Sequence, residues 1–592
     1  MLALGRRRRA SFLLFCVVLA CWFIGAGFWV AGNPWTLDND HLAPLDYLGL
    51  VFSRGMDFKD ILHARIPSLF PDFVIQGLAM SWSGVTLAAF SWAYLLQLGT
   101  GLGLAFLLSA LLPGAGEVRK FCSFSFVLVL VLLVPNVVRD TIFLSGFPAR
   151  HGGNWINTAL AMSLSIVLIG GRLGGWKKVG AWFVLSAVVA TSVFSNRLFV
   201  VSYVMPWLAS LLGISTLTYV SGRSGESGFS INAMRFFPSL LLGSALGFLG
   251  YLAVMHQCHE VGTVFSFERF SINFKYLASN GGLVFYSLPP LLFAIRSLGG
   301  LRTWGAPKMP SFFSVDSVGL LSVWLSAYLG LIAFCALKTP LPGSDGIRYL
   351  IFSSYAVLIL LGNELCRVLS SLFITSDCLS KGSGSSAPPF FRFSCILPTG
   401  GWSVLGGAFI FLASLWSAHG EVVSSYSESY RGRLEWLSGR LKEAGLTGST
   451  GYVVNPPWNS RALQLLLPGG STVLTVSSDG NPFLFHHSRT QFVKSGDLVG
   501  SLGPRAEDVV APSWVLTAPH ERERMYRYFG EPLARLGCFA EGECLYLFDS
   551  QKMARNTSTF LSSWQADYYG CLEIGSRLES FRSWLKRRVG MR

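Results

Sequence analysis

Charged residues are scarce in this sequence of 592 residues. Asp, Glu, Lys and Arg together make up 13% of it, about half the share of roughly 25% that is usual in soluble domains. Hydrophobic residues make up 51%, and the mean hydropathy is +0.48. This composition excludes a soluble globular chain of the same length and predicts a polytopic α-helical membrane protein.

Several motifs with well-defined chemistry are also missing. The sequence has no phosphate-binding glycine loop, no Gly-x-Ser-x-Gly, no His-Glu-x-x-His and no repeat of fixed period. Its formal charge of +15 is carried mostly by short loops between apolar segments. No polar segment holds a compact basic run interleaved with aromatic residues, so the sequence argues against nucleic-acid binding.

The first apolar segment sets the predicted orientation of the chain. Ser11 to Ala31 is long enough to cross a bilayer. Arg6 to Arg9 precede it and favour a cytoplasmic N-terminus. We interpret the segment as a retained helix rather than a cleaved signal, because the exit at Asn33-Pro34-Trp35 has no small-x-small cleavage site. The residues that follow are therefore predicted to emerge outside the cytoplasm.

Ten further spans bring the predicted total to eleven. They run at about 85–112, 121–143, 156–171, 179–194, 199–219, 236–256, 281–295, 315–336, 347–366 and 395–418. Residues 33–84 form the first external loop, and we interpret its apolar stretches as interfacial helices. With this count the basic loops fall on the cytoplasmic side. Residues 1–418 are thus predicted to form one transmembrane domain.

Residues 419–592 have the composition of a soluble domain that ends in a basic tail. Strands are expected at 452–455, 471–476, 513–516 and 544–548, and helices at 431–444 and 521–529. This alternation predicts an α/β domain, and the odd number of spans places it in the periplasm. The spacing of Cys538 and Cys544 permits a disulfide in such a compartment without requiring one.

An acidic cluster, Asp38-Asn39-Asp40-His41, follows the first span directly. Ionised carboxylates at a membrane surface are costly, so their presence there usually marks a functional site. Two interpretations stay open: the acids cap the next helix, or they act as a catalytic base or as ligands of a divalent metal ion. The sequence indicates no other cofactor.

Cations also lie at the outer ends of predicted spans, where the positive-inside rule does not expect them. They are Arg150, Arg269, Lys275 and Arg348, with His151, Asp345 and Tyr349 beside them in the sequence. Binding of an anionic phosphate at the interface would account for them. Arg348 has the alternative role of anchoring its helix by snorkelling. His256 and His259 lack a second ligand pair, and we interpret them as solvated.

The order of these parts resembles that of the GT-C glycosyltransferases, which include the bacterial aminoarabinose transferase and the protein O-mannosyltransferases. In that superfamily a catalytic carboxylate lies in the first external loop, at the place of Trp35-Thr-Leu-Asp38-Asn-Asp40-His41. Asp345-Gly-Ile-Arg348-Tyr349 is similar to the family's common Arg-Tyr at the start of a late span. Many relatives have Asp-Glu followed by an aromatic residue in the first loop, so it stays open which aspartate is catalytic here.

The resemblance implies a function. A sugar would be transferred from a polyprenyl-phosphate donor to a glycan, lipid or protein acceptor on the periplasmic face of the inner membrane. Asp40, with Asp38 as second choice, would be the general base, and His41 would support it. The four external cations would bind the donor phosphate, supported by His151, Tyr349 and Asp345.

Two other classes of function stay open. A transporter or flippase of a lipid-linked sugar would use ionisable residues inside spans, for which Asp140 and Glu364 are the candidates. A non-catalytic envelope-assembly protein would use the C-terminal domain as a binding module.

Overall fold

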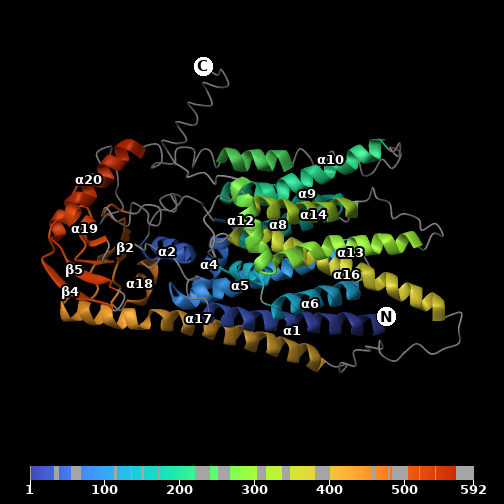
Figure 1. The fold of residues 1–592 in the computed structure, drawn as a ribbon, viewed down its shortest axis with the longest axis horizontal. Helices are drawn as coiled ribbons and strands as arrows, with labels where there is room; N and C mark the ends of the chain where they lie inside the picture. Colours follow the sequence, from blue (N-terminus) through green and yellow to red (C-terminus); the bar gives the residue numbers. More distant parts are fainter. Residues whose placement is uncertain are drawn as a thin grey trace, which may run out of the picture. The chain divides into compact units, whose positions relative to one another are not determined.

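The computed structural model divides the chain into two compact units (Figure 1). The first, the helical unit, comprises Met1–Trp29, Tyr94–Gly247 and Gly262–Gly420. The second, the mixed unit, comprises Val30–Ala93, Phe248–Val261 and Glu421–Arg592. The structure describes residues 2–32, 39–54, 69–112, 117–134, 136–148, 152–170, 173–196, 198–220, 240–250, 267–302, 315–336, 347–380, 401–454, 460–467, 469–477, 480–482, 492, 505–518, 521–539 and 542–568.

Helices of different lengths build the helical unit. They are α1 (Leu2–Gly32), α5 (Leu87–Leu111), α6 (Glu117–Leu133), α7 (Val137–Leu144), α8 (Gly152–Ile169), α9 (Gly175–Ser195), η3 (Val200–Val204), α10 (Met205–Val220), α12 (Phe267–Ser279), α13 (Gly282–Arg302), α14 (Val315–Cys335), η4 (Arg348–Leu350), α16 (Ile351–Ser380) and α17 (Gly401–Glu443). Residues 30–32 of α1, 87–93 of α5 and 421–443 of α17 belong to the mixed unit, however. Within the described residues, seven helices are long and apolar enough to cross a membrane, or up to nine if each of two bent pairs counts as one span. A multi-pass membrane protein is therefore confirmed, and the count of eleven stays a prediction.

Two predicted spans differ from straight helices. The span predicted at 121–143 consists of α6 and α7, which are bent by 100°. The span predicted at 281–295 corresponds to the first part of α13. α12 directly precedes α13, and the two helices are bent by 85° relative to each other. Asn136 caps α7 by accepting a hydrogen bond from the backbone N–H of Arg139 (2.9 Å). An apolar run alone does not reveal such a break.

The two breaks lie against each other. The N–H of Val137, the first residue of α7, donates to the carbonyl of Asn280 between α12 and α13 (3.1 Å). Gly281 has φ +69°, which favours glycine. A Cβ on Gly282 would come within 2.6 Å of the Val137 side chain. Irregular backbone inside a membrane protein needs partners from the protein itself, and here each break helps to satisfy the other.

Hydroxyl groups join the most deeply buried helices of the helical unit. Thr158 on α8 bonds the hydroxyl of Ser202 in η3 (2.7 Å), and Asn154 donates to the same hydroxyl (3.2 Å). Tyr355 on α16 bonds Ser145 (2.9 Å). Small polar side chains of this kind let membrane helices approach closely and bond across the interface. These contacts fix the position of α16, which begins at Ile351 directly after η4.

A five-stranded sheet forms the centre of the C-terminal part of the mixed unit. Its strands are β1 (Gly451–Val454), β2 (Val473–Val476), β3 (Trp514–Thr517), β4 (Ala534–Cys538) and β5 (Cys544–Leu547), in the order β2-β1-β3-β5-β4. β1 pairs in parallel with β2 and β3, and β5 pairs antiparallel with β3 and β4. The sequence predicted four of these strands and missed β4, whose residues are mostly exposed.

Helices cover both faces of this sheet, as Figure 1 shows. On one face, Met525 of α19 (Arg522–Phe529) and Met553 of α20 (Ser550–Tyr568) pack against Tyr452 of β1. On the other, Leu437 of α17 and Leu463 of α18 (Ser460–Leu466) pack against Val453. Alternate residues of each strand thus enter opposite apolar layers. This confirms a small α/β region near the C-terminus.

Helix α17 joins two elements that the sequence analysis treated separately. Residues 401–418 of the last predicted span and residues 431–443 of the predicted helix at 431–444 belong to one helix of 43 residues. The first external loop belongs to the mixed unit, because residues 30–93 are grouped there with residues 421–592.

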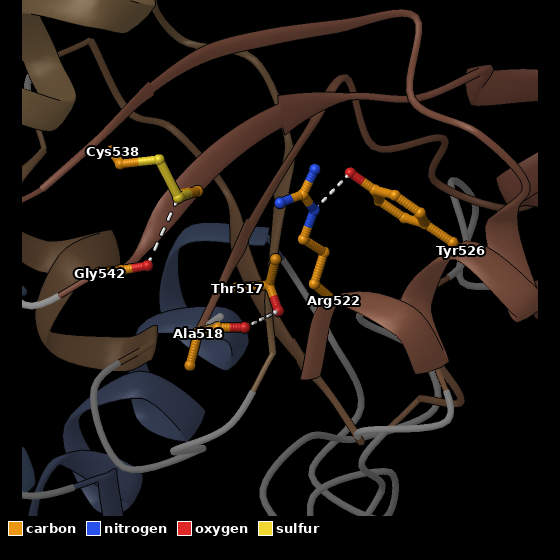
Figure 2. The surroundings of a disulfide bond; sticks show 7 residues. Thr517, Ala518, Arg522, Tyr526, Cys538 and Gly542 are labelled. Carbon is orange, nitrogen blue, oxygen red and sulfur yellow. Dashed lines mark hydrogen bonds between the residues drawn. A yellow bond between two sulfur atoms is a disulfide. The ribbon is translucent and has the colours of Figure 1, made fainter. Parts of the chain in front are cut away.

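The disulfide between Cys538 and Cys544 is formed (Figure 2). These cysteines end β4 and begin β5, where they face each other in the antiparallel register. The pairing that the spacing permitted is therefore confirmed.

We expect this bond to be detectable by thiol labelling. A maleimide added to unfolded protein should label Cys538 and Cys544 only after reduction. Replacing both by serine should remove the labelling that appears on reduction. It should also lower the free energy of unfolding by about 2 kcal/mol, because the unfolded chain is no longer restricted by the short disulfide-closed loop. Equal labelling before and after reduction would show that the disulfide does not form.

Candidate functional site

The first-loop acids lead into helix α2 (Asn39–Arg54) of the mixed unit. Asp40 lies in its first turn, and Asp38 lies outside the described residues. Pro44, four residues after Asp40, lies inside the helix. Since proline has no N–H, it cannot make the usual intrahelical bond to the carbonyl of Asp40. His41, predicted to support the base, is buried.

A buried ion pair connects α2 to the C-terminal sheet region within the mixed unit. Asp46 on α2 is 6% exposed and Arg461 on α18 is 1% exposed. The Arg461 Nε donates to Asp46 Oδ2 (3.1 Å). The Gln464 Nε2 donates to the other carboxylate oxygen, Oδ1, also at 3.1 Å. Both oxygens of Asp46 are therefore bound by one helix of the α/β region.

Two further contacts complete this arrangement, which we call the Asp46 clamp (Asp46, Tyr47, Arg461 and Gln464). The Arg461 guanidinium carbon lies 4.9 Å from the centre of the Tyr47 ring, a cation–π contact. The Gln464 Oε1 accepts a hydrogen bond from the N–H of Val473, the first residue of β2 (3.2 Å). The clamp thus joins α2, α18 and the edge strand β2.

The other helices of the first loop pack on α2 as well. They are η2 (Leu69–Phe73) and α4 (Val74–Ser83). A Cβ on Gly49 of α2 would come within 2.9 Å of Val85, so a glycine is needed for this close approach. α4 has ten residues, about 15 Å of helix, which is too short for a hydrocarbon core of about 30 Å. Its length agrees with the predicted interfacial helix.

Arg348 and Tyr349 form η4 at the start of a candidate span in the helical unit. Both side chains are half-buried. The Arg348 guanidinium carbon lies 5.3 Å from the centre of the Tyr349 ring. η4 packs against α7, α14 and α16. The two residues that the sequence analysis paired are therefore in contact, at the end of a span as predicted.

Helix α7, which contacts η4, adds an ion pair that the sequence analysis did not assign to the site. Arg139 donates through Nε (3.1 Å) and Nη2 (2.9 Å) to one oxygen of Asp140. Asp140, which the sequence analysis named as an ionisable residue that a transporter would use, thus forms an ion pair with Arg139. Lys275 and Arg269 lie on α12, where Lys275 is exposed and Arg269 is half-buried.

Several predicted site residues cannot be placed. Asp38, Arg150, His151 and Asp345 lie outside the described residues. His256 and His259, which the sequence analysis interpreted as solvated, lie outside them as well. Among those that the structure describes, no group of three or more His, Cys, Asp or Glu side chains is arranged to hold a metal ion.

Sequence reasoning missed the Asp46 clamp. Asp46 and Arg461 are 415 positions apart, and neither lies in a motif. The one local signal was the amphipathic pattern from Asp46 to Phe52, which indicated a buried face but no partner.

Solved structures of a membrane-lipid-binding protein are similar to this chain at low sequence identity. No protein-family model and no curated protein sequence matches this chain. A crystal structure of ArnT from Cupriavidus metallidurans bound to undecaprenyl phosphate is similar at 11% identity and a TM-score of 0.46, covering 90% of this chain and 97% of that one. The apo state of the same protein gives 11% identity, a TM-score of 0.48, and coverage of 91% and 98%. Values this low do not establish a shared activity.

Proposed function

We propose that this protein is an integral membrane glycosyltransferase of the GT-C type. It would move a sugar from a polyprenyl-phosphate donor to a hydroxyl of a glycan, lipid or protein acceptor outside the cytoplasm. The observation that carries the proposal is the placement of Asp40. It lies in the first turn of α2, the helix that follows the first candidate span, and buried contacts of the Asp46 clamp hold α2 within the mixed unit.

The proposed reaction has one chemical step. The Asp40 carboxylate takes the proton of the acceptor hydroxyl, and the acceptor oxygen forms a bond to the anomeric carbon of the sugar. The bond between that carbon and the phosphate oxygen breaks, and polyprenyl phosphate leaves with the electron pair. Cations stabilise the negative charge that grows on this phosphate. Asp38 is the second choice for the base.

Arg348 is our first candidate for the phosphate. A guanidinium has paired donors that fit two phosphate oxygens at once. Arg348 is half-buried and in contact with Tyr349, so it has few conformations in the unbound protein. Binding a phosphate therefore costs it little conformational entropy. Arg150, Lys275 and Arg269 are further candidates for the same charge, and His41, His151, Tyr349 and Asp345 for supporting roles.

A transporter remains the second candidate function, because Glu364 on α16 is completely buried in the helical unit. Ionisable groups buried among membrane helices are often functional. Two arginines, however, neutralise this carboxylate: Arg296 at 3.2 Å and Arg367 at 3.1 Å. Such an arrangement fits a fixed connection between α13 and α16 at least as well as a transport site.

Purified protein in lipid nanodiscs tests the proposed function. It should release undecaprenyl phosphate from an undecaprenyl-phosphate sugar when membrane extract supplies acceptors, and a deletion strain should lack the corresponding glycan. Movement of the lipid across vesicle membranes without release of undecaprenyl phosphate would favour the transporter instead.

The role of Arg348 leads to a graded prediction. Arg348→Lys keeps the charge but loses the paired donors, so it should retain partial activity. Arg348→Ala should lose nearly all of it, on the order of 10²-fold or more, as expected for the loss of one donor to a developing negative charge. The activity is measured as a function of donor concentration. Arg431→Ala, at an exposed position, is the control. A wild-type donor response in Arg348→Ala would rule out this role.

A further inference from the structure

Gln76 on α4 is a buried amide that has no hydrogen-bond partner among the described residues. Its side chain is 0% exposed. Among the residues that the structure describes, neither its Nε2 nor its Oε1 makes a hydrogen bond. Buried amides are nearly always bonded, because leaving one unpaired destabilises the fold. Its retention in the interior therefore calls for a reason other than stability.

The surroundings of Gln76 point to the proposed site. η2 and α4 both pack on α2, the helix that begins beside Asp40. Asp72, four residues before Gln76, is also buried, as is His41 in the first turn of α2. A Cβ on Gly77 would be in ordinary van der Waals contact with Leu48 of α2, at 3.9 Å. Three buried polar side chains, Gln76, Asp72 and His41, thus belong to helices that pack on one another.

A second buried glutamine shows what a structural role looks like. Gln97 on α5, in the helical unit, is 1% exposed. Its Nε2 donates to the backbone carbonyls of Ser145 (3.1 Å) and Phe147 (3.3 Å). Gln97 therefore bonds the backbone of the turn at residues 145–147, whereas Gln76 makes no such bond to any described residue.

We propose that Gln76 binds hydroxyl groups of a sugar in the transfer site, a role that rests on the proposed function. Its amide offers one acceptor oxygen and two N–H donors. A sugar hydroxyl both donates and accepts, so one amide can pair with two neighbouring hydroxyls. The sugar belongs either to the donor lipid or to the acceptor glycan. Gln76 would be a specificity-determining residue, and the sugar would supply the partners that the fold leaves out.

Gln76→Met tests this inference because methionine has nearly the same volume and no hydrogen-bonding amide. Without any ligand, the variant should have a higher Tm than the wild type, since an unpaired buried amide has been removed. Gln97→Met is the matched control and should have a lower Tm, because two buried carbonyls lose their donor. A lower Tm for Gln76→Met would mean that the amide is structural and would overturn the inference.

Binding and kinetics identify the source of the sugar. The probes are undecaprenyl phosphate carrying a hexose, carrying a pentose, or without sugar. If the donor sugar is bound, Gln76→Met should weaken binding of one sugar-bearing probe about tenfold and leave the bare lipid phosphate unaffected. If the acceptor is bound, the KM for acceptor should rise by a similar factor with donor binding unchanged. Unchanged values in both measurements would overturn the inference.

The outcomes also separate this inference from the proposed function. Wild-type protein that transfers no sugar would contradict the proposed function, whatever the Tm values. Normal transfer by Gln76→Met with unchanged KM values would contradict only the role of Gln76. Gln76→Asn, which keeps an amide on a shorter side chain, should recover part of the lost affinity if the hydroxyl bond is the cause.

Discussion

Arg461→Met is expected to lower the free energy of unfolding of the mixed unit by about 3–5 kcal/mol. The arginine is 1% exposed, and its removal leaves the Asp46 carboxylate buried without its cation. Gln464 can still donate to one oxygen of Asp46, but it carries no charge. The cation–π contact with Tyr47 is lost as well. Thermal or denaturant unfolding of the purified protein measures the change.

A double variant separates the ion pair from the packing. Asp46→Leu combined with Arg461→Met removes both charges, so it should be far less destabilised than Arg461→Met alone. Arg431→Met provides the exposed comparison, because Arg431 and Glu435 are 71% and 74% exposed. An exposed pair of this kind contributes about 0.2–1 kcal/mol at most. Equal effects of Arg431→Met and Arg461→Met would mean that the clamp is not buried in solution.

Asp40→Asn is expected to reduce the transfer rate by about 10²–10⁴-fold, the usual effect of losing a general base. Asparagine has almost the same shape as aspartate, and the clamp that fixes α2 is left intact, so expression and Tm should stay close to wild type. The rate is measured at saturating donor with the sugar-bearing undecaprenyl phosphate that supports the highest wild-type activity.

Asp38→Asn is the matched control in the same loop. If Asp40 is the base, Asp38→Asn should retain most of the activity, and the reverse result would assign the base to Asp38. Full activity in both single variants would remove this loop from the chemistry. Because Arg461→Met should loosen α2 without touching Asp40, its loss of activity should follow its loss of stability.

The local features of the chain could be predicted from the sequence. Apolar segments longer than about 18 residues predicted spans that the structure contains as α1, α5 and α14. A helix of that length and composition is what crossing a hydrocarbon core requires. Short runs of β-branched and aromatic residues predicted β1, β2, β3 and β5. β4 was missed because Ala534–Cys538 contains a glycine and mostly exposed residues, and it becomes a strand only by pairing with β5.

Contacts between distant segments could not be predicted in the same way. The bends at Asn136 and Asn280 depend on one break supplying a hydrogen-bond acceptor for the other, and no local pattern contains that information.

The sequence by itself determined that the chain is a membrane protein, where several of its spans lie, and which acids and cations are candidates for chemistry. Those properties follow from composition and from periodicity along the chain. Only the tertiary structure decided that Asp46 is paired with Arg461 and that Gln76 has no hydrogen-bond partner among the residues that the structure describes. Burial converts an ordinary Asp, Arg or Gln into a group whose hydrogen bonds must be provided by a specific neighbour, and that neighbour is chosen by packing in three dimensions.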